Sequence, residues 1–197
     1  AQAWLIARDN TIAGIFKTLP AEGHPPLWYL ILYPFAQTGV PHHILDFISG
    51  SVMIGAVYLL LFKTKVNPLL KLALPFSYFF FYEYAIVGRN YCFYVFFITA
   101  IIALYEKRFD KPWLFALCVV GLYNSHVLVF TFAFGVMMLF LWDSVQQKKL
   151  NGSVLGGFAL MCIGGLYLIP YLFMSSMVRF YQTKILDHAG LAKTAIT

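Results

Sequence analysis

The strongest constraint in the sequence is a series of long apolar segments separated by short polar stretches. The clear segments cover residues 44–62, 68–84, 92–105, 112–123, 127–143 and 152–173. Only 11% of the residues are charged, whereas a soluble domain needs about 25% charged residues to cover its surface. Most of the surface of these segments must therefore face lipid. The pattern predicts an all-α polytopic membrane protein with about six transmembrane helices.

The residues before the first clear segment have a different character. Over residues 2–18 apolar side chains recur at helical spacing, but Arg8 and Asp9 interrupt them, which predicts an amphipathic helix on the membrane surface. Residues 20–23 are expected to end this helix. Residues 27–36 are apolar but shorter than the roughly 20 residues that cross a bilayer. We interpret them as a re-entrant or interfacial helix, with a short true span as the alternative.

The turns between the apolar segments fall into two groups by charge. One group is short and basic, with Lys63, Lys65, Lys107, Arg108, Lys111, Lys148 and Lys149. Short basic loops are typical of the cytoplasmic side of a membrane, so the net charge of +6 does not indicate a nucleic-acid partner. The other group gathers polar side chains and all five histidines, namely Asp9, Glu22, His24, His42, His43, Glu83, Arg89, Asn90, Asn124, His126, Asp187 and His188.

This alternation requires that residues 27–36 do not cross the membrane, because a crossing would split the second group between two sides. The charge pattern alone leaves both topologies open. The organisation that we predict is an external-face segment over residues 1–41, a transmembrane core over 42–173, and an external-face loop or tail over 174–197. The cysteines lie inside apolar segments without ligand-like spacing, which indicates buried small hydrophobic residues at Cys92, Cys118 and Cys162.

Ionisable groups near membrane depth are costly and usually functional. We therefore predict a polar site on the outer face, where three separate turns supply Glu22 with His24, Arg89 with Asn90, and Asn124 with His126. Each pair also has a plainer interpretation. The first would cap the helix that begins at the two prolines and anchor a turn, Arg89 would extend to lipid headgroups, and the third would be an ordinary helix turn.

Three motifs in the chain resemble one family of membrane enzymes. Residues 1–9 (AQAWLIARD), 22–27 (EGHPPL) and 88–91 (GRNY) resemble the N-terminal half of the GT-C class of integral-membrane glycosyltransferases. The closest likeness is to the bacterial branch around the protein O-mannosyltransferases and the aminoarabinose transferase. The likeness covers most of the chain in topology and is sharp in these motifs.

The resemblance implies a GT-C-like fold and a glycosyltransferase that moves a sugar from a polyprenyl-phosphate donor. The acceptor would be a lipid, a glycan or a protein at the outer face of a bacterial inner membrane. Such a reaction needs a carboxylate as general base and a cation that holds the departing phosphate. The catalytic candidates are Asp9 and Glu22. The substrate-binding candidates are His24, Arg89, Asn90, Tyr91, Asn124 and His126.

The resemblance also bears on a metal ion and on the extent of the chain. In some members an acid at the position of Glu22 contributes to a metal site, so Glu22 and His188 are the candidate ligands of a divalent metal ion; no other cofactor is expected. The family's key carboxylate follows the first membrane helix. We expect that carboxylate, that helix and the long C-terminal part of such enzymes to lie outside this sequence.

Other functions remain open on the sequence. The main alternative is a lipid-handling transporter or a non-catalytic membrane subunit, and a further one is a lipid-linked acyltransferase with His126 as base. The sequence contains no Walker motif and no dinucleotide fingerprint.

Overall fold

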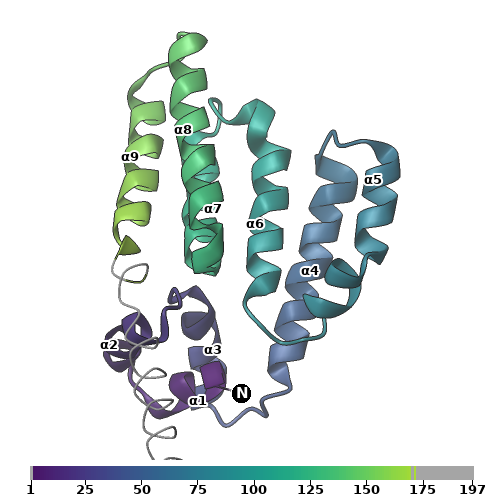
Figure 1. Ribbon diagram of the computed structural model, residues 1–197, viewed down its shortest axis with the longest axis vertical. Helices are drawn as coiled ribbons and strands as arrows, with labels where there is room; N and C mark the ends of the chain where they lie inside the picture. The colour runs from purple at the N-terminus through teal and green to yellow at the C-terminus, as the bar shows by residue number, and fades with distance from the viewer. Residues whose placement is uncertain (1, 170, 172–197) are drawn as a thin grey trace, which may run out of the picture.

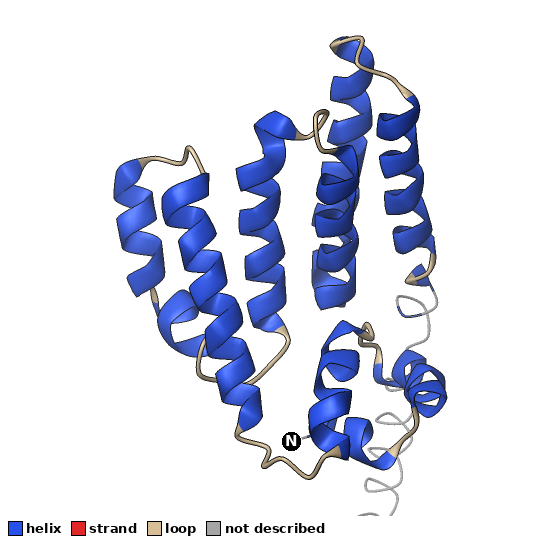
Figure 2. Cartoon of the chain, turned by 180° about the vertical axis from the view of Figure 1, so that it is seen from behind, coloured by secondary structure: helices blue, strands red, loops and turns tan. Residues whose placement is uncertain are grey.

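The computed structural model describes residues 2–169 and 171, and these residues form helices and connecting loops without any strand (Figures 1 and 2). A small N-terminal unit contains α1 (Gln2–Asp9), α2 (Ile12–Glu22) and α3 (Leu27–Gln37). The longer helices that follow lie side by side, and they are α4 (Ile44–Lys63), α5 (Pro68–Ala73), α6 (Tyr91–Leu104), α7 (Pro112–Ser125), α8 (Phe130–Gln146) and α9 (Gly152–Leu166). Single-turn elements complete the described part, at η1 (Leu74–Phe76), η2 (Phe79–Glu83), η3 (Tyr105–Lys107) and η4 (Val127–Val129).

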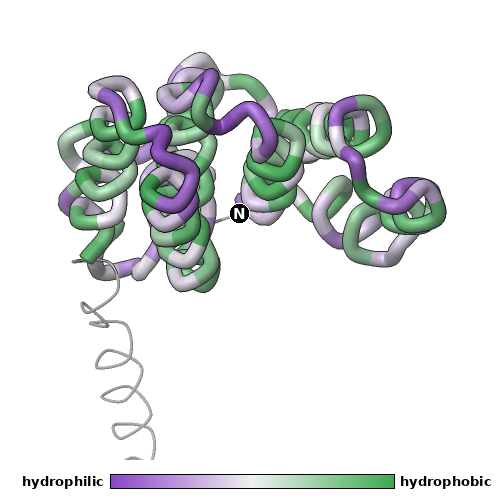
Figure 3. The backbone as a smooth tube through the Cα atoms, turned by 90° about the horizontal axis from the view of Figure 1, so that it is seen from above, coloured by the Kyte–Doolittle hydropathy of each residue, from purple (hydrophilic) through white to green (hydrophobic). Residues whose placement is uncertain are grey.

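The loops of the bundle alternate between two ends. The α4–α5, α6–α7 and α8–α9 loops lie at the upper end in Figure 1, whereas the α7–α8 connection and the start of α6 lie at the lower end beside α1, α2 and α3. The loops at the upper end contain the basic clusters, and Figure 3 shows hydrophilic loops there between apolar helices. Over residues 2–169, the two groups of turns that the sequence separates by charge therefore lie at opposite ends of the molecule.

Two stretches of helix are long and apolar enough to cross a membrane, Ile44–Lys63 and Val127–Gln146. In each of them only 28% of the most apolar window is buried inside the molecule, which is unlike the core helix of a soluble protein. Large apolar side chains point outward instead, such as Phe47 (71% exposed) and Ile54 (72% exposed). Apolar surface of this extent marks contact with lipid or with another protein, so the structure indicates membrane association.

The expected count of about six spanning helices is met only in part. Residues 68–84 are not one helix, because Pro75 lacks an N–H group and Ser77 adopts an extended backbone, so the stretch divides into α5, η1 and η2. α6 and α7 have 14 residues each and α9 has 15. At 1.5 Å per residue such helices are about 21–23 Å long, against a hydrocarbon core of about 30 Å.

The predicted amphipathic helix over residues 2–18 is in fact two helices. Asn10 ends α1 by donating its side-chain amide to the Ile6 carbonyl at 3.0 Å, and the Thr11 hydroxyl caps α2 by accepting from the Gly14 N–H at 3.2 Å. Both residue types favour helix ends because their side chains bond to free backbone groups. The second helix then continues through Pro20 and ends at Glu22, so the expected break comes at the end of the range 20–23.

The short segment that we expect over residues 27–36 is an 11-residue helix, α3. Its length of about 16 Å is half of a bilayer core. One face of α3 is buried through Trp28, Tyr29, Leu32 and Ala36, and α3 packs against α1, α2 and α7. This helix therefore attaches the N-terminal unit to the end of the bundle.

α7 lies at the centre of the packing. It packs against α6 and α9 along its length and also contacts α3 and α8. Its side chains include some of the largest that are fully buried, among them Phe115, Leu122 and Tyr123. Phe115 stacks on Phe140 of α8 with ring centroids 5.4 Å apart.

Glycines allow the close contact of α9 with α7, as the glycine-rich sequence of the last segment predicts. A Cβ atom at Gly157 would lie 3.0 Å from the backbone oxygen of Pro112, and one at Gly164 would lie 2.8 Å from the Val120 side chain. A methyl group therefore has no room at either position. Two of the three cysteines, Cys92 and Cys118, are buried as expected, and Cys162 is half-buried.

A buried ion pair fixes the basic end of the bundle. Arg108, which is 7% exposed, bonds through Nη2 to Asp143 Oδ2 at 2.7 Å, and the Tyr105 hydroxyl donates to the same oxygen at 2.9 Å. The guanidinium also lies over the Tyr105 and Phe109 rings at 4.1 and 4.5 Å. This pair joins the α6–α7 loop to α8 across 35 residues of sequence, and the sequence gives no local signal for it.

We predict that Gly157→Ala destabilises the protein by about 1–3 kcal/mol, because overpacking against a fixed backbone oxygen forces α7 and α9 apart. Gly135→Ala in α8 is the matched control, since a Cβ atom there meets nothing within 4 Å. That change should be neutral or gain up to about 1 kcal/mol from helix propensity. Thermal unfolding of the purified variants in detergent measures both, and equal effects would contradict the close contact.

Candidate functional site

The first turn of the site joins α2 to α3. Gly23 ends α2 in the left-handed conformation with φ 69°, which a glycine adopts without strain, and its N–H donates to Leu19 O at 3.0 Å. This turn places Glu22 and His24 next to each other, and His24 Nδ1 bonds to Glu22 O at 2.8 Å. The N-cap of α3 is Pro26, without a side-chain hydrogen bond. Neither Glu22 nor His24 therefore caps α3, but the bond between them anchors the turn, as the plainer interpretation also expects.

The second turn comes just before α6. Gly88 lies against the start of α4, where a Cβ atom would be 2.8 Å from Asp46 Oδ1 and 2.8 Å from Leu45 Cβ. Asn90 is 9% exposed and donates its side-chain amide to Ser125 O at 2.7 Å. This bond ties the start of α6 to the end of α7, so Asn90 holds two of the three turns together.

The third turn follows α7. The Asn124 side chain donates back to Val120 O at 2.9 Å within its own helix. His126 leaves the helix in an extended conformation, and its Nδ1 accepts the Leu128 N–H at 3.1 Å. Since Nδ1 acts as acceptor, the proton of the neutral ring is assigned to Nε2.

The three turns meet at His126. Its ring packs edge-on against His24 with centroids 6.0 Å apart, and against Tyr91 at 5.3 Å. The Arg89 guanidinium lies near the same tyrosine, 6.0 Å from the centroid of the Tyr91 ring. Glu22, His24, Arg89, Tyr91 and His126 thus lie together at one end of the bundle, although they are up to 104 residues apart in sequence.

Burial and charge act on two groups of the site. Burial, with a smaller effect from the charge of His24, lowers the pKa of His126, which keeps its ring neutral at pH 7. Burial and the nearby carboxylate of Glu22 raise the pKa of Tyr29 to about 12. The Arg89 side chain is exposed, and no carboxylate of the described residues lies within 4.0 Å of it. Its charge is therefore free to meet an anion.

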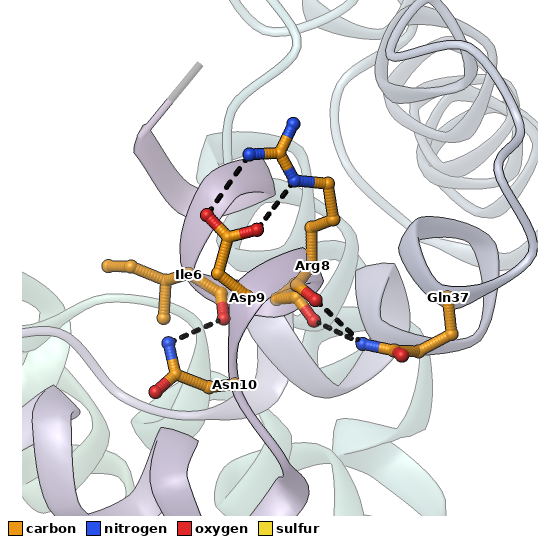
Figure 4. A network of polar contacts seen from close by, with 6 residues as sticks. Ile6, Arg8, Asp9, Asn10 and Gln37 are labelled. Atoms are coloured by element: carbon orange, nitrogen blue, oxygen red, sulfur yellow. Dashed lines mark hydrogen bonds and ion pairs between the residues drawn. The ribbon is translucent and has the colours of Figure 1, made fainter.

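Asp9, the other predicted catalytic candidate, pairs with Arg8 at the end of α1 (Figure 4). Its carboxylate accepts two bonds from Arg8, at 2.6 and 3.1 Å, and the pair is exposed. These hydrogen bonds, with the positive charge of Arg8, lower the pKa of Asp9. Figure 4 also shows Gln37 of α3, which donates to the Ala7 and Arg8 carbonyls at 3.0 Å and so closes the end of α1.

The metal site that the resemblance implies has one ligand outside the described residues, because His188 belongs to the part from 172 to 197. Within the part of the chain that the structure describes, no three His, Cys, Asp or Glu side chains come close enough to hold a metal ion. The predicted tail from 174 to 197 also lies outside the described residues.

Sequence patterns miss some residues of the site. Gln2 donates its side-chain amide to Glu22 Oε2 at 2.6 Å and so fixes this carboxylate from another helix. Ser125 supplies the carbonyl that holds Asn90. Neither contact has a sequence signal, because both depend on how separate helices pack. No protein-family model, curated protein or solved structure matches the chain.

His126 makes the stability of the protein pH-dependent. Because folding lowers its pKa, the unfolded chain binds a proton at a higher pH than the folded chain does. Stability should therefore be constant above the ordinary histidine pKa of about 6.5 and fall as the pH drops below it. His126→Gln should reduce this loss, and His43→Gln, in an exposed loop, should not. Unfolding midpoints at pH 5.5 and 7.5 test this, and an unchanged loss in His126→Gln would contradict it.

Proposed function

We propose that the chain is the N-terminal core of a GT-C-like glycosyltransferase that uses a polyprenyl-phosphate sugar. The observation that supports this best is the convergence of the three turns at His126, with a free guanidinium beside them. The site lies at the end of the bundle opposite the basic loops. The family resemblance assigns sugar transfer to the same motifs, namely residues 22–27 and 88–91.

The proposal includes six membrane crossings. Chain direction alternates from α4 to α9, and α4 and α8 run the same way between the two ends (Figure 1). If these two long helices cross the membrane, the elements between them must cross as well. Basic loops favour the cytoplasmic side, which puts the site on the periplasmic or extracellular face of a bacterial inner membrane.

Arg89 is the residue that we assign to the departing phosphate. It is exposed, it has no carboxylate partner among the described residues, and its guanidinium lies 6.0 Å from the Tyr91 ring. Guanidinium groups bind phosphate through paired, charge-assisted hydrogen bonds. Asn90 is a positioning residue in this proposal, because its amide is already used to hold the turn.

Glu22 is the better base of the two candidate carboxylates. The charge of Asp9 is already compensated by Arg8, whereas Glu22 lies beside the histidine cluster and is fixed by Gln2. In the reaction, the acceptor hydroxyl attacks the anomeric carbon of the sugar and its proton passes to the carboxylate. The bond from that carbon to the phosphate oxygen breaks, and the phosphate keeps the electron pair next to Arg89. A divalent metal ion at Glu22 and His188 stays a prediction of the resemblance.

We predict that Arg89→Ala in the full-length protein lowers sugar transfer from a polyprenyl-phosphate donor by about 100-fold or more, in line with the loss of a charge-stabilising donor. Arg89→Lys should recover part of this, because it keeps the charge and loses the paired geometry. Arg8→Ala, at the same end of the molecule but paired with Asp9, is the matched control. Full activity in both Arg89→Ala and Glu22→Gln would refute the assignment.

The second candidate function is lipid handling without catalysis, and a pocket of about 290 Å³ favours it. This pocket is lined only by apolar surface, from Tyr123, Phe130, Phe134, Met137, Cys162, Gly165, Leu166 and Ile169. Transfer of a labelled polyprenyl phosphate between vesicles, in a preparation that transfers no sugar, would favour this function over the first.

A further inference from the structure

The basic end of the bundle has most of the net charge of the chain. Its basic side chains are Lys63, Lys65, Lys71, Lys107, Arg108, Lys111, Lys148 and Lys149, and its acidic ones are Glu106, Asp110 and Asp143. The result is a net charge of +5, against +6 for all 197 residues. The candidate site lies at the other end, so this charge has another role.

Some of these charges are already paired inside the protein. Arg108 is buried against Asp143, and Lys65 pairs with Glu106 at 2.6 Å. Lys71 donates to the Leu61 and Thr64 carbonyls at 3.1 and 2.5 Å. The remaining lysines are exposed, and no carboxylate of the described residues lies within 4.0 Å of them: Lys63, Lys107, Lys111, Lys148 and Lys149.

One of these unpaired lysines, Lys111, lines a surface pocket between the α6–α7 and α8–α9 loops. The pocket has a volume of about 430 Å³, and its lining includes Lys111, the polar residues Asn151 and Ser153, and the rings of Phe109 and Trp113. Lys149 approaches from the other loop, with Nζ 5.6 Å from the Phe109 ring. The pocket lining therefore includes a lysine, two polar residues and two aromatic residues.

Exposed apolar side chains border the pocket on the side of the helices. Trp113 is 51% exposed, and its ring occupies the space that a side chain at Gly156 of α9 would need. Leu114, which also lines the pocket, is exposed as well. Tryptophan is enriched where hydrocarbon meets headgroups, with lysine extending outward from it.

We propose that this pocket, defined by Lys111, Trp113, Asn151 and Ser153, with Lys149 near the ring of its lining residue Phe109, binds the phosphate headgroup of an anionic phospholipid. The charge of this end fits an anionic leaflet, and the exposed Trp113 and Leu114 give acyl chains an apolar surface beside the headgroup. A free phosphate ion would use the lysines but not this apolar border. The inference stands on the basic end alone and does not depend on sugar transfer.

The pocket also contains one acid, Asp110, which gives the proposal a test in both directions. Its carboxylate repels a phosphate, so Asp110→Asn should tighten binding, whereas Lys111→Gln should weaken it. Each juxtamembrane lysine contributes a roughly fivefold factor to the binding of anionic lipid. A purely structural effect of the loop would not reverse its sign between neighbouring residues.

The experiment measures phosphatidylglycerol binding to the detergent-purified full-length protein by native mass spectrometry. We expect about fivefold weaker binding in Lys111→Gln, a further loss when Lys149→Gln is added, and tighter binding in Asp110→Asn. Lys17→Gln, an exposed lysine in the N-terminal unit, should leave binding unchanged. Phosphatidylcholine should bind weakly to all variants.

Inorganic phosphate in excess separates the two sources of the anion. If it displaces phosphatidylglycerol at millimolar concentration, the pocket binds free phosphate and the lipid assignment is wrong. Equal losses in Lys111→Gln and Lys17→Gln would overturn the pocket altogether, because binding would then follow only the total charge. Unfolding midpoints of the variants, all of which change exposed side chains, show that the fold is kept.

Discussion

The packing of α7 is the interaction on which the rest of the structure depends. This helix packs against α6 and α9 along its length, contacts α8, and reaches α3 at one end. Its glycine-lined contact with α9 leaves no room for a methyl group. Since α7 runs from one end of the bundle to the other, its packing positions residues both at the basic end and at the candidate site. Its first residues line the pocket at the basic end. At its other end, the Ser125 carbonyl accepts the bond from Asn90, and His126, which follows the helix, packs against Tyr91.

The two ends differ in what their charges do. At the basic end the arginine is buried against Asp143, and exposed lysines stay unpaired among the described residues. At the opposite end the arginine is the exposed residue, beside a pair of histidines and a carboxylate that a neighbouring helix fixes. Such a division suits a protein that faces two different surfaces of a membrane. It also separates the proposed reaction site from the proposed lipid-headgroup site, so that a test can contradict one assignment and leave the other intact.

Much of this arrangement is predictable from local sequence. Apolar runs ended by basic clusters predict the helices and the end at which each loop lies, and the shortness of residues 27–36 correctly predicts a helix too short to cross a bilayer. The misses have physical reasons. The hydrophobic pattern continues across residues 2–18 and 68–84, but each segment is divided. Capping by Asn10 and Thr11 breaks the first, and the missing N–H of Pro75 with the extended backbone of Ser77 breaks the second. The sequence also brings Glu22, Arg89 and His126 to one end, but the bonds that hold them, from Gln2 and to Ser125, arise only from packing between helices.

The central claim is that the histidine-rich turns and the basic loops face opposite sides of a membrane. Single cysteines at two exposed loop positions test it directly, in a background where Cys92, Cys118 and Cys162 are replaced by alanine: His42→Cys near the candidate site and Gln147→Cys at the basic end. A membrane-impermeant maleimide is applied to intact cells and, separately, to inverted vesicles. The proposed topology predicts labelling of His42→Cys only from outside and of Gln147→Cys only from the cytoplasmic side. Labelling of both positions from the same side would contradict the arrangement.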